Sequence, residues 1–479
     1  MIKYIQRNIS TGLILGILLI GALIQANLIM KSAYLAIALS GAVFFLLLFF
    51  KAPLGLLMIM VFIFPFSGTE AFRSAMADIP GFKPLQLLSL ALMAVALLNL
   101  RNAVQPPKSA VIFFAGIIIL FTIAIARSLP YLEDINQVQP ERLSVLRYIL
   151  SSYFKPLIYF IPALIITLYV YSTKDIERIS QTINWSITIL SIVIIGFYLV
   201  NPEMVADPRA ARGFYATSFG LHTNSIVNYY ILGFPFILTD LFRNKIFVGS
   251  LKIALCAIAV AFLYSRSAYF LLIASFFIYI FVSKRAKWLP VFVVIMLASY
   301  FIIPESVMER ATKGFHSGDR NDITAGRVDN IWLPLLKEGT ADPKTILFGN
   351  GRYAMVSTDA HKRRLVIQAM HPHNMYLEMY LDAGLIGLFM ILPLFGYLLK
   401  KSYTLMRDGV DHPNKEYLTA VITSVVCFLI SGLTDRTFFP DEINGYLWLI
   451  VGLTFVICRQ IAYANEMSRT DPVVSVGKP

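Results

Sequence analysis

Charged residues are scarce in this chain. Only 14% of its 479 residues are Asp, Glu, Lys or Arg, whereas 57% are hydrophobic and 13% are aromatic. A soluble domain of this size cannot hide so much apolar surface in one core. The composition therefore excludes a soluble enzyme or binding module and indicates an integral membrane protein.

Cysteine is nearly absent, with only three residues, Cys256, Cys427 and Cys458. Each lies inside an apolar run with no CxxC pair nearby, which excludes a disulfide framework and a zinc ribbon. The net charge of +13 is spread over many short loops and forms no aromatic-interleaved basic stripe. We therefore expect no nucleic-acid partner, and we attribute the positive charge to membrane topology and an anionic ligand.

Motifs for nucleotide and cofactor binding are also missing. The chain has no Walker P-loop, no GxSxG elbow and no dinucleotide-binding glycine fingerprint. The Gly-rich turn GNGRYA, residues 349–354, lacks the Lys-Ser/Thr pair of a P-loop. We expect no cofactor.

Long apolar runs dominate the sequence instead. Their lengths, about 17 to 25 residues, suit helices that cross a bilayer, and no alternating pattern suggests a barrel. The first run is too long for a signal peptide, so we expect an uncleaved first span. The predicted fold is an all-α polytopic membrane protein with about 12–14 transmembrane helices and one long extracytoplasmic loop. The candidate spans lie near 9–30, 33–50, 53–66, 84–100, 109–127, 155–172, 183–200, 222–242, 246–264, 267–283, 288–304, 374–399, 416–434 and 442–461.

The distribution of Lys and Arg predicts the orientation. With the N-terminus inside, most basic short loops fall on the cytoplasmic side. The long segment from 304 to 372 then lies outside, and its charged, amphipathic pieces predict a small helical subdomain. We expect N-terminal transmembrane helices in 1–303, the long outer loop in 304–372, C-terminal transmembrane helices in 373–462 and a cytoplasmic tail in 463–479.

Three arginines share the predicted outer face: Arg212, Arg266 and Arg327. Arg266 stands almost alone between two apolar runs, where a charge is costly unless an anion pairs with it. Guanidinium groups offer planar, bidentate donors to phosphate oxygens and stay charged when desolvated. Together the three predict a diphosphate site, although each alone could be a solvated charge, and Arg266 could reach lipid phosphates instead.

The segment HPHN, residues 371–374, directly precedes a predicted span. His373 is a candidate general base, because imidazole titrates near neutrality and the positive end of a helix favours its neutral form. It could instead only cap the helix. A metal site is a further alternative, but HxH alone is a weak signal and we expect no metal. Its candidate ligands are His371, His373, His361, His316 and Glu378.

The histidine segment also carries a family pattern. His373-Asn374, nine residues, Gly384, two residues and Gly387 resemble the H[N/S/Q]-x9-G-x-x-G pattern of the O-antigen ligase and polymerase superfamily of bacterial envelope glycan enzymes. The resemblance covers residues 200–455. Its other parts follow in the family's order: Arg212-Gly213 with Asn224, Ser265-Arg266, Arg327 to Trp332, and the turn with Gly349 and Gly351.

This resemblance implies a metal-independent glycosyltransferase at the periplasmic face of the bacterial inner membrane. The donor would be a glycan on undecaprenyl diphosphate, and the acceptor a sugar hydroxyl of lipid A core or of a lipid-linked glycan. By analogy His373 would be the general base. Arg212 and Arg327 would hold the diphosphate, with Arg266 as a third contact.

Ligase, polymerase and protein glycosyltransferase remain alternatives. We favour the ligase because the histidine pattern matches the ligase form closely. A polymerase would join undecaprenyl diphosphate-linked repeat units instead. A transporter of the lipid-linked oligosaccharide would also need many spans and an arginine cluster, but we would expect its charges to lie mid-span and face both sides.

Overall fold

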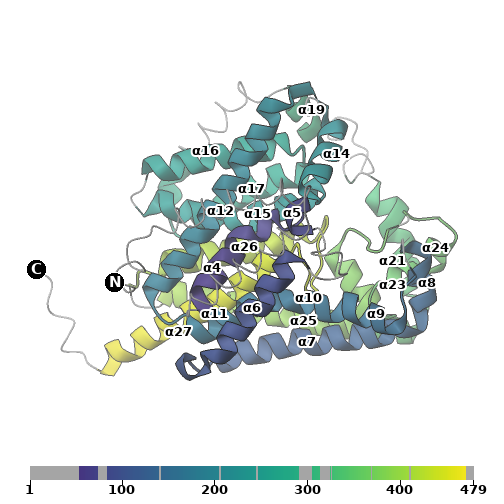
Figure 1. Ribbon diagram of the computed structural model, residues 1–479, viewed down its shortest axis with the longest axis horizontal. Coiled ribbons are helices and arrows are strands. Elements are labelled where there is room, and N and C mark those ends of the chain that lie inside the picture. The colour runs from purple at the N-terminus through teal and green to yellow at the C-terminus, as the bar shows by residue number, and fades with distance from the viewer. Residues whose placement is uncertain are drawn as a thin grey trace, which may run out of the picture.

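The computed structural model describes residues 53–73, 83–139, 142–203, 207–243, 246–290, 305–312, 324, 326–367, 369–408 and 411–470. The predicted spans 9–30 and 33–50, most of 288–304 and the end of the predicted tail lie outside these residues. Within them every regular element is a helix (Figure 1). The all-α prediction is therefore confirmed.

The helices of the first half are α4 (Pro53–Ile63), η1 (Phe64–Phe66), α5 (Glu70–Arg73), α6 (Pro84–Leu98), η3 (Leu100–Asn102), α7 (Lys108–Ser128), η4 (Leu129–Tyr131), α8 (Leu132–Val138), α9 (Val145–Ile149), η5 (Leu150–Phe154), α10 (Lys155–Leu157), η6 (Ile158–Phe160), α11 (Ile161–Tyr169), α12 (Thr173–Val200) and α14 (Pro208–Phe219). The second half comprises α15 (Thr223–Phe242), α16 (Ile246–Phe262), α17 (Arg266–Val282), η7 (Ala286–Trp288), α19 (Glu305–Thr312), η8 (Val328–Trp332), α21 (Leu333–Gly339), α22 (Pro343–Phe348), α23 (Ala354–Ser357), α24 (Asp359–Lys362), α25 (Met375–Asp408), α26 (Lys415–Ser431) and α27 (Gly445–Thr470).

Six described helical segments are long and apolar enough to cross a membrane: Lys108–Val138, Val145–Tyr169, Thr173–Val200, Thr223–Phe242, Met375–Asp408 and Gly445–Ser468. Four shorter apolar helices accompany them, Pro53–Phe66, Pro84–Leu98, Ile246–Phe262 and Arg266–Val282. The chain is a polytopic membrane protein, as predicted, while the total number of spans stays a prediction. α27 continues to Thr470, so helix extends into the predicted tail.

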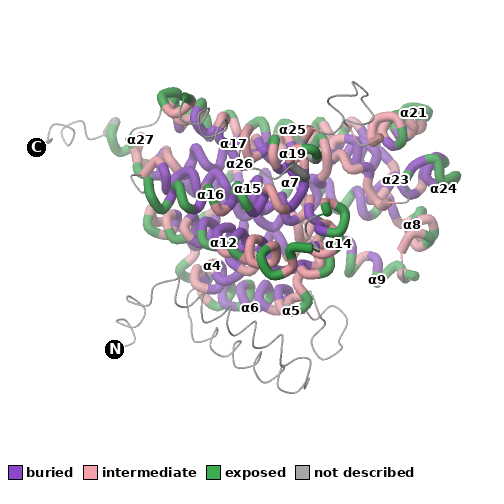
Figure 2. Tube along the Cα trace, turned by 90° about the horizontal axis from the view of Figure 1, so that it is seen from above, coloured by how far each residue is buried: buried purple, intermediate pink, exposed green. Residues whose placement is uncertain are grey.

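Helix α15 forms the centre of the bundle. Its apolar stretch is 89% buried, against 44% for α12, because α15 packs against α12, α16, α17 and α26. Figure 2 shows the buried residues along the middle of the molecule. The polar start of α15, with Asn224, therefore lies at one end of the protein core rather than at the lipid surface.

Helix α25 carries the histidine motif and lies beside α7 (Figure 1). Gly384 has φ +67° and interrupts the helical backbone. At this kink the carbonyls of Leu381 and Asp382 accept hydrogen bonds from Asn350 N at 2.8 Å and Gly351 N at 2.9 Å. The Gly-rich turn is thus bonded directly to the backbone of α25.

The close approach between α25 and the segment around the Gly-rich turn explains Gly384, the first glycine of the histidine pattern. A Cβ on Gly384 would lie 2.3 Å from the carbonyl carbon and oxygen of Leu347, and one on Gly349 would lie 2.5 Å from the backbone of Asp382 and Ala383. Both glycines also have positive φ. Side chains at these positions would push the two backbones apart.

Residues 326–367, which we name the loop subdomain, contain η8 and α21 to α24. They pack on the first turns of α25 through a separate apolar cluster that includes Ile331, Leu335, Met355, Leu377 and Leu381. In Figure 1 the subdomain lies at one end of the molecule, beyond the main bundle. Its position relative to a membrane leaflet stays a prediction.

Candidate active site

A cavity of about 870 Å³ lies where the loop subdomain meets the starts of α15, α17 and α25. Its lining includes Arg212, Arg266, Arg327 and His373, the residues predicted to bind diphosphate or to act as base. The fold thus brings together side chains that lie far apart in the chain. Asn374, Gly384 and Gly387 do not line the cavity, so these motif residues act on the backbone conformation and not as contacts in the site.

His373 is held from both sides just before α25. Its φ is +54°, a sparsely populated region for a residue with a side chain. Asn374 caps the helix, because its Oδ1 accepts from Tyr376 N at 3.0 Å and Leu377 N at 3.1 Å. Trp332 Nε1 donates to the carbonyl of Pro372 at 2.9 Å. These contacts orient the imidazole toward the cavity.

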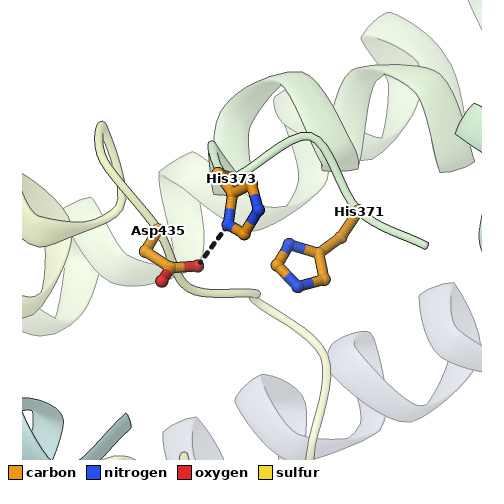
Figure 3. Close-up of side chains that lie close together, drawn as sticks. All are labelled: His371, His373 and Asp435. Carbon is orange, nitrogen blue, oxygen red and sulfur yellow. Dashed lines mark hydrogen bonds and ion pairs between the residues drawn. The ribbon is translucent and has the colours of Figure 1, made fainter. Parts of the chain in front are cut away.

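Asp435 is the partner of His373. Its Oδ1 lies 3.4 Å from His373 Nδ1 (Figure 3), and its Oδ2 accepts from Asn224 Nδ2 at 3.4 Å. Although burial by itself raises the pKa of the Asp435 carboxyl, the hydrogen bond from His373 and the charge of Arg436 hold this pKa well below its usual value. With a proton on Nδ1 donated to this carboxylate, Nε2 is left to accept one.

The sequence analysis did not single out Asp435, which is followed directly by Arg436. The bond between these neighbours runs from Arg436 N to Asp435 Oδ1 at 3.1 Å, while the carboxylate faces His373. The only local signal was a polar TDR tripeptide between two apolar runs.

His371 lies beside this pair, and the atoms of His371, His373 and Asp435 that could ligate a metal lie within 4.8 Å of one another (Figure 3). Burial lowers the pKa of His371, so it is neutral at neutral pH. The predicted set of alternative metal ligands was different. His361 does not line the cavity, His316 lies outside the described residues, and Asp435 was not in the set. The positive charge of Arg436 next to Asp435 opposes a bound cation.

The arginine side of the cavity, which we define as Arg212, Arg266 and Arg327, comes from three different elements. Arg212 of α14 donates to the Tyr264 carbonyl at 3.1 Å, and Arg327 donates to the Thr434 carbonyl. Arg266 begins α17, where the backbone N–H groups of the helix add to its positive charge. Burial lowers the pKa of Arg327, but a guanidinium starts so far above neutrality that it keeps its charge. These three guanidinium groups give this side of the cavity positive charge and hydrogen-bond donors.

Comparison with known families gives a match. Residues 251–392 match the family model described as O-antigen ligase. This region, less than half of the chain, resembles an O-antigen ligase domain. The resemblance predicted from the histidine motif is thereby confirmed, and no curated protein matches the chain. The apolar helices and this match indicate a multi-pass bacterial membrane protein, and members of the matched family are glycosyltransferase-like membrane enzymes.

The matched O-antigen ligase region includes Arg266, Arg327 and His373. Arg212 and Asp435 lie outside it, although both line the cavity. The cavity therefore also uses residues outside the matched region. Arg212 in α14 precedes this region in the sequence, and Asp435 in the loop before α27 follows it.

The cavity also has a carboxylate side, which we define as Glu378, Asp441 and the buried Arg352. Arg352 pairs with Glu378 and, at 3.0 Å, with Asp382. Its guanidinium also lies over the rings of Tyr353, 4.4 Å from the centroid, and Phe439, at 4.8 Å. Sequence reasoning named Glu378 only as a metal ligand and did not single out Arg352 or this arrangement.

His373 and Asp435 are electrostatic neighbours of residues on both sides of the cavity. The charged neighbours of His222 are Arg212, Arg327, His373 and Asp435. Those of His371 are Glu378, Arg352, His373 and Asp435. His373 and Asp435 are thus common to both sets, whereas Arg212 and Arg327 appear only in the first and Glu378 and Arg352 only in the second.

Proposed function

We propose that this protein is an O-antigen ligase-type glycosyltransferase. It would move a glycan from undecaprenyl diphosphate to a sugar hydroxyl of lipid A core at the periplasmic face of the inner membrane. One observation carries the proposal: a single cavity is lined by a histidine–carboxylate pair and by three arginines from separate elements. A base next to an anion site is what transfer from a diphosphate requires.

The chemistry follows from this placement. His373 Nε2 takes the proton of the acceptor hydroxyl while Asp435 holds the Nδ1–H and stabilises the imidazolium that forms. The acceptor oxygen attacks the anomeric carbon of the donor sugar, and the bond from that carbon to the phosphate oxygen breaks. Undecaprenyl diphosphate leaves with the bonding electrons. Arg212, Arg266 and Arg327 stabilise the negative charge on its leaving oxygen.

The proposed reaction needs no divalent cation. The arginine side supplies the positive charge that a metal ion provides in many phosphate-handling enzymes. We therefore expect transfer by the purified protein to be unchanged by EDTA. A loss of transfer restored by added metal would instead assign His371, His373 and Asp435 to a metal site.

The deciding experiment replaces the only cellular copy with His373→Ala and follows surface glycans and lipid-carrier glycans in parallel. We expect at least about a 100-fold loss of transfer, since general-base catalysis contributes about 10²–10⁴-fold. Long chains stranded on the carrier indicate a ligase. Surface glycans stopped at one repeat unit indicate a polymerase, and a wild-type pattern would remove His373 from the mechanism.

A matched control is His412→Ala. His412 precedes α26 and is not part of the cavity lining. Its glycan pattern is expected to equal that of the wild type, with equal amounts of protein in the membrane.

A further inference from the structure

Glu378 of the carboxylate side has an unused acceptor. The residue is only 4% exposed and lines the cavity one turn into α25. One oxygen, Oε1, accepts from Arg352, whereas Oε2 is buried with no hydrogen-bond partner among the described residues. A buried carboxylate oxygen without a donor is unfavourable, so a donor is expected from whatever fills the cavity.

Asp441 lies on the same side of the cavity, in the loop before α27. Its Oδ1 accepts from Asn444 N at 2.7 Å. Desolvation raises the pKa of Asp441 to about 7, so its protonated and ionised forms both occur near neutrality. The group can therefore donate as well as accept a hydrogen bond, which matches the dual character of a hydroxyl.

The charge balance shows which ligand fits here. The positive charge of Arg352 is already shared between Glu378 and Asp382, and Asp441 adds a further carboxyl group. Because the charge of Arg352 is already balanced, it offers little attraction to a phosphate, whereas an uncharged polyol needs none. Trp332 and Tyr353 also line the cavity and offer aromatic faces to the C–H surface of a sugar ring.

We propose that Glu378 and Asp441 form the subsite that binds hydroxyl groups of the acceptor sugar, across His373 from the arginine side. This inference rests on the proposed function and deepens it. The donor diphosphate occupies the arginine side, and the hydroxyl that loses its proton to His373 comes from the carboxylate side. Glu378 and Asp441 contact the acceptor and hold it in place, while His373 does the proton transfer.

The test measures donor and acceptor binding separately. Wild-type protein in lipid nanodiscs would receive lipid-linked glycan from the host membrane as donor. Lipid A core glycolipid and lipid-linked repeat units from the same membrane would be titrated as acceptors. Glu378→Gln keeps the size of the side chain and removes its charge. We expect its KM for the acceptor to rise about 10- to 100-fold, as for loss of a hydrogen bond to a charged group, with the KM for the donor unchanged.

Asp382→Asn is the matched control. Asp382, which is also in α25, likewise pairs with Arg352, but it does not line the cavity. If the carboxylates act only by holding Arg352, both variants will shift the acceptor KM equally, and the subsite is refuted. If Glu378 contacts the acceptor, Asp382→Asn will keep the wild-type acceptor KM.

Failure of the proposed function would look different. Wild-type protein that transfers to neither acceptor would overturn the function and the subsite together. Wild-type transfer with an unchanged acceptor KM in Glu378→Gln would overturn the subsite alone. An equal rise of donor and acceptor KM in that variant would also refute a separate acceptor side.

Discussion

On the arginine side of the cavity, Arg327 donates to the backbone carbonyl of Thr434, whereas on the carboxylate side Arg352 is held by Glu378 and Asp382. A carbonyl is neutral, so the bond to Thr434 orients Arg327 without cancelling its charge. Two carboxylates cancel the charge of Arg352 and leave it as a structural link. The partners of an arginine, more than its presence at a cavity, thus indicate whether it is available to a phosphate.

Replacing Arg352 should have the largest effect on folding. Arg352→Ala leaves Glu378 and Asp382 buried without their cation, which costs about 3–5 kcal/mol. Thermal unfolding in detergent micelles would measure this loss. Arg363→Ala, which removes an exposed arginine of α24's end, should stay within about 0.5 kcal/mol of the wild type. Equal stability of the two variants would contradict the contrast.

Arg327 should affect binding instead of folding. Arg327→Ala is expected to weaken binding of undecaprenyl diphosphate about 10- to 100-fold, with an unfolding midpoint close to the wild type. Arg327→Lys should recover part of the affinity, because it restores the charge without the bidentate geometry. Calorimetric titration with undecaprenyl diphosphate would measure both. Unchanged affinity would place the diphosphate elsewhere.

Gly384 tests how the Gly-rich turn, which precedes Arg352, is held against α25. Gly384→Ala forces a side chain into a positive-φ position against the backbone of Leu347, which should cost about 1–3 kcal/mol. Gly396→Ala in the same helix meets nothing within 4 Å and should be neutral or stabilising. Comparing the unfolding midpoints decides the matter, and an equal response of the two glycines would refute the close approach.

The last effect concerns the pH dependence that Asp441 gives to stability. Its pKa is raised to about 7 in the folded protein, so the folded state holds a proton that the unfolded state releases near pH 4. This contribution to stability is present at low pH and is lost as the pH rises through about 7. Asp441→Asn should flatten that decline in a series of unfolding midpoints, whereas the exposed Asp359→Asn should leave it unchanged. A wild-type slope in Asp441→Asn would assign the decline to other groups.

Much of the architecture was predictable from local pattern. The predicted span 109–127 corresponds to α7 at Lys108–Ser128, and 222–242 corresponds to α15 at Thr223–Phe242. Such agreement is expected, because the apolar length of a membrane helix is a property of one continuous segment. The prediction that α25 begins after HPHN also holds, since Asn374 is a good capping residue.

The pairing within the site was not predictable in the same way. His373 and Asp435 are 62 residues apart, and Arg327 and Thr434 are 107 apart. Asp435 follows Thr434 in a short polar loop, so nothing in its neighbourhood distinguishes a catalytic partner from a surface pair. Only the packing of α25 against α26 and α27 brings this loop next to His373.

The sequence by itself determined a helical membrane protein, its histidine motif and the residue types available for phosphate and base chemistry. These depend on composition and short spacings, which folding does not change. Tertiary structure decided which arginine is neutralised, which carboxylate orients His373, and that Glu378 lines the cavity. Such assignments depend on distances between segments remote in the chain, and only packing sets those distances.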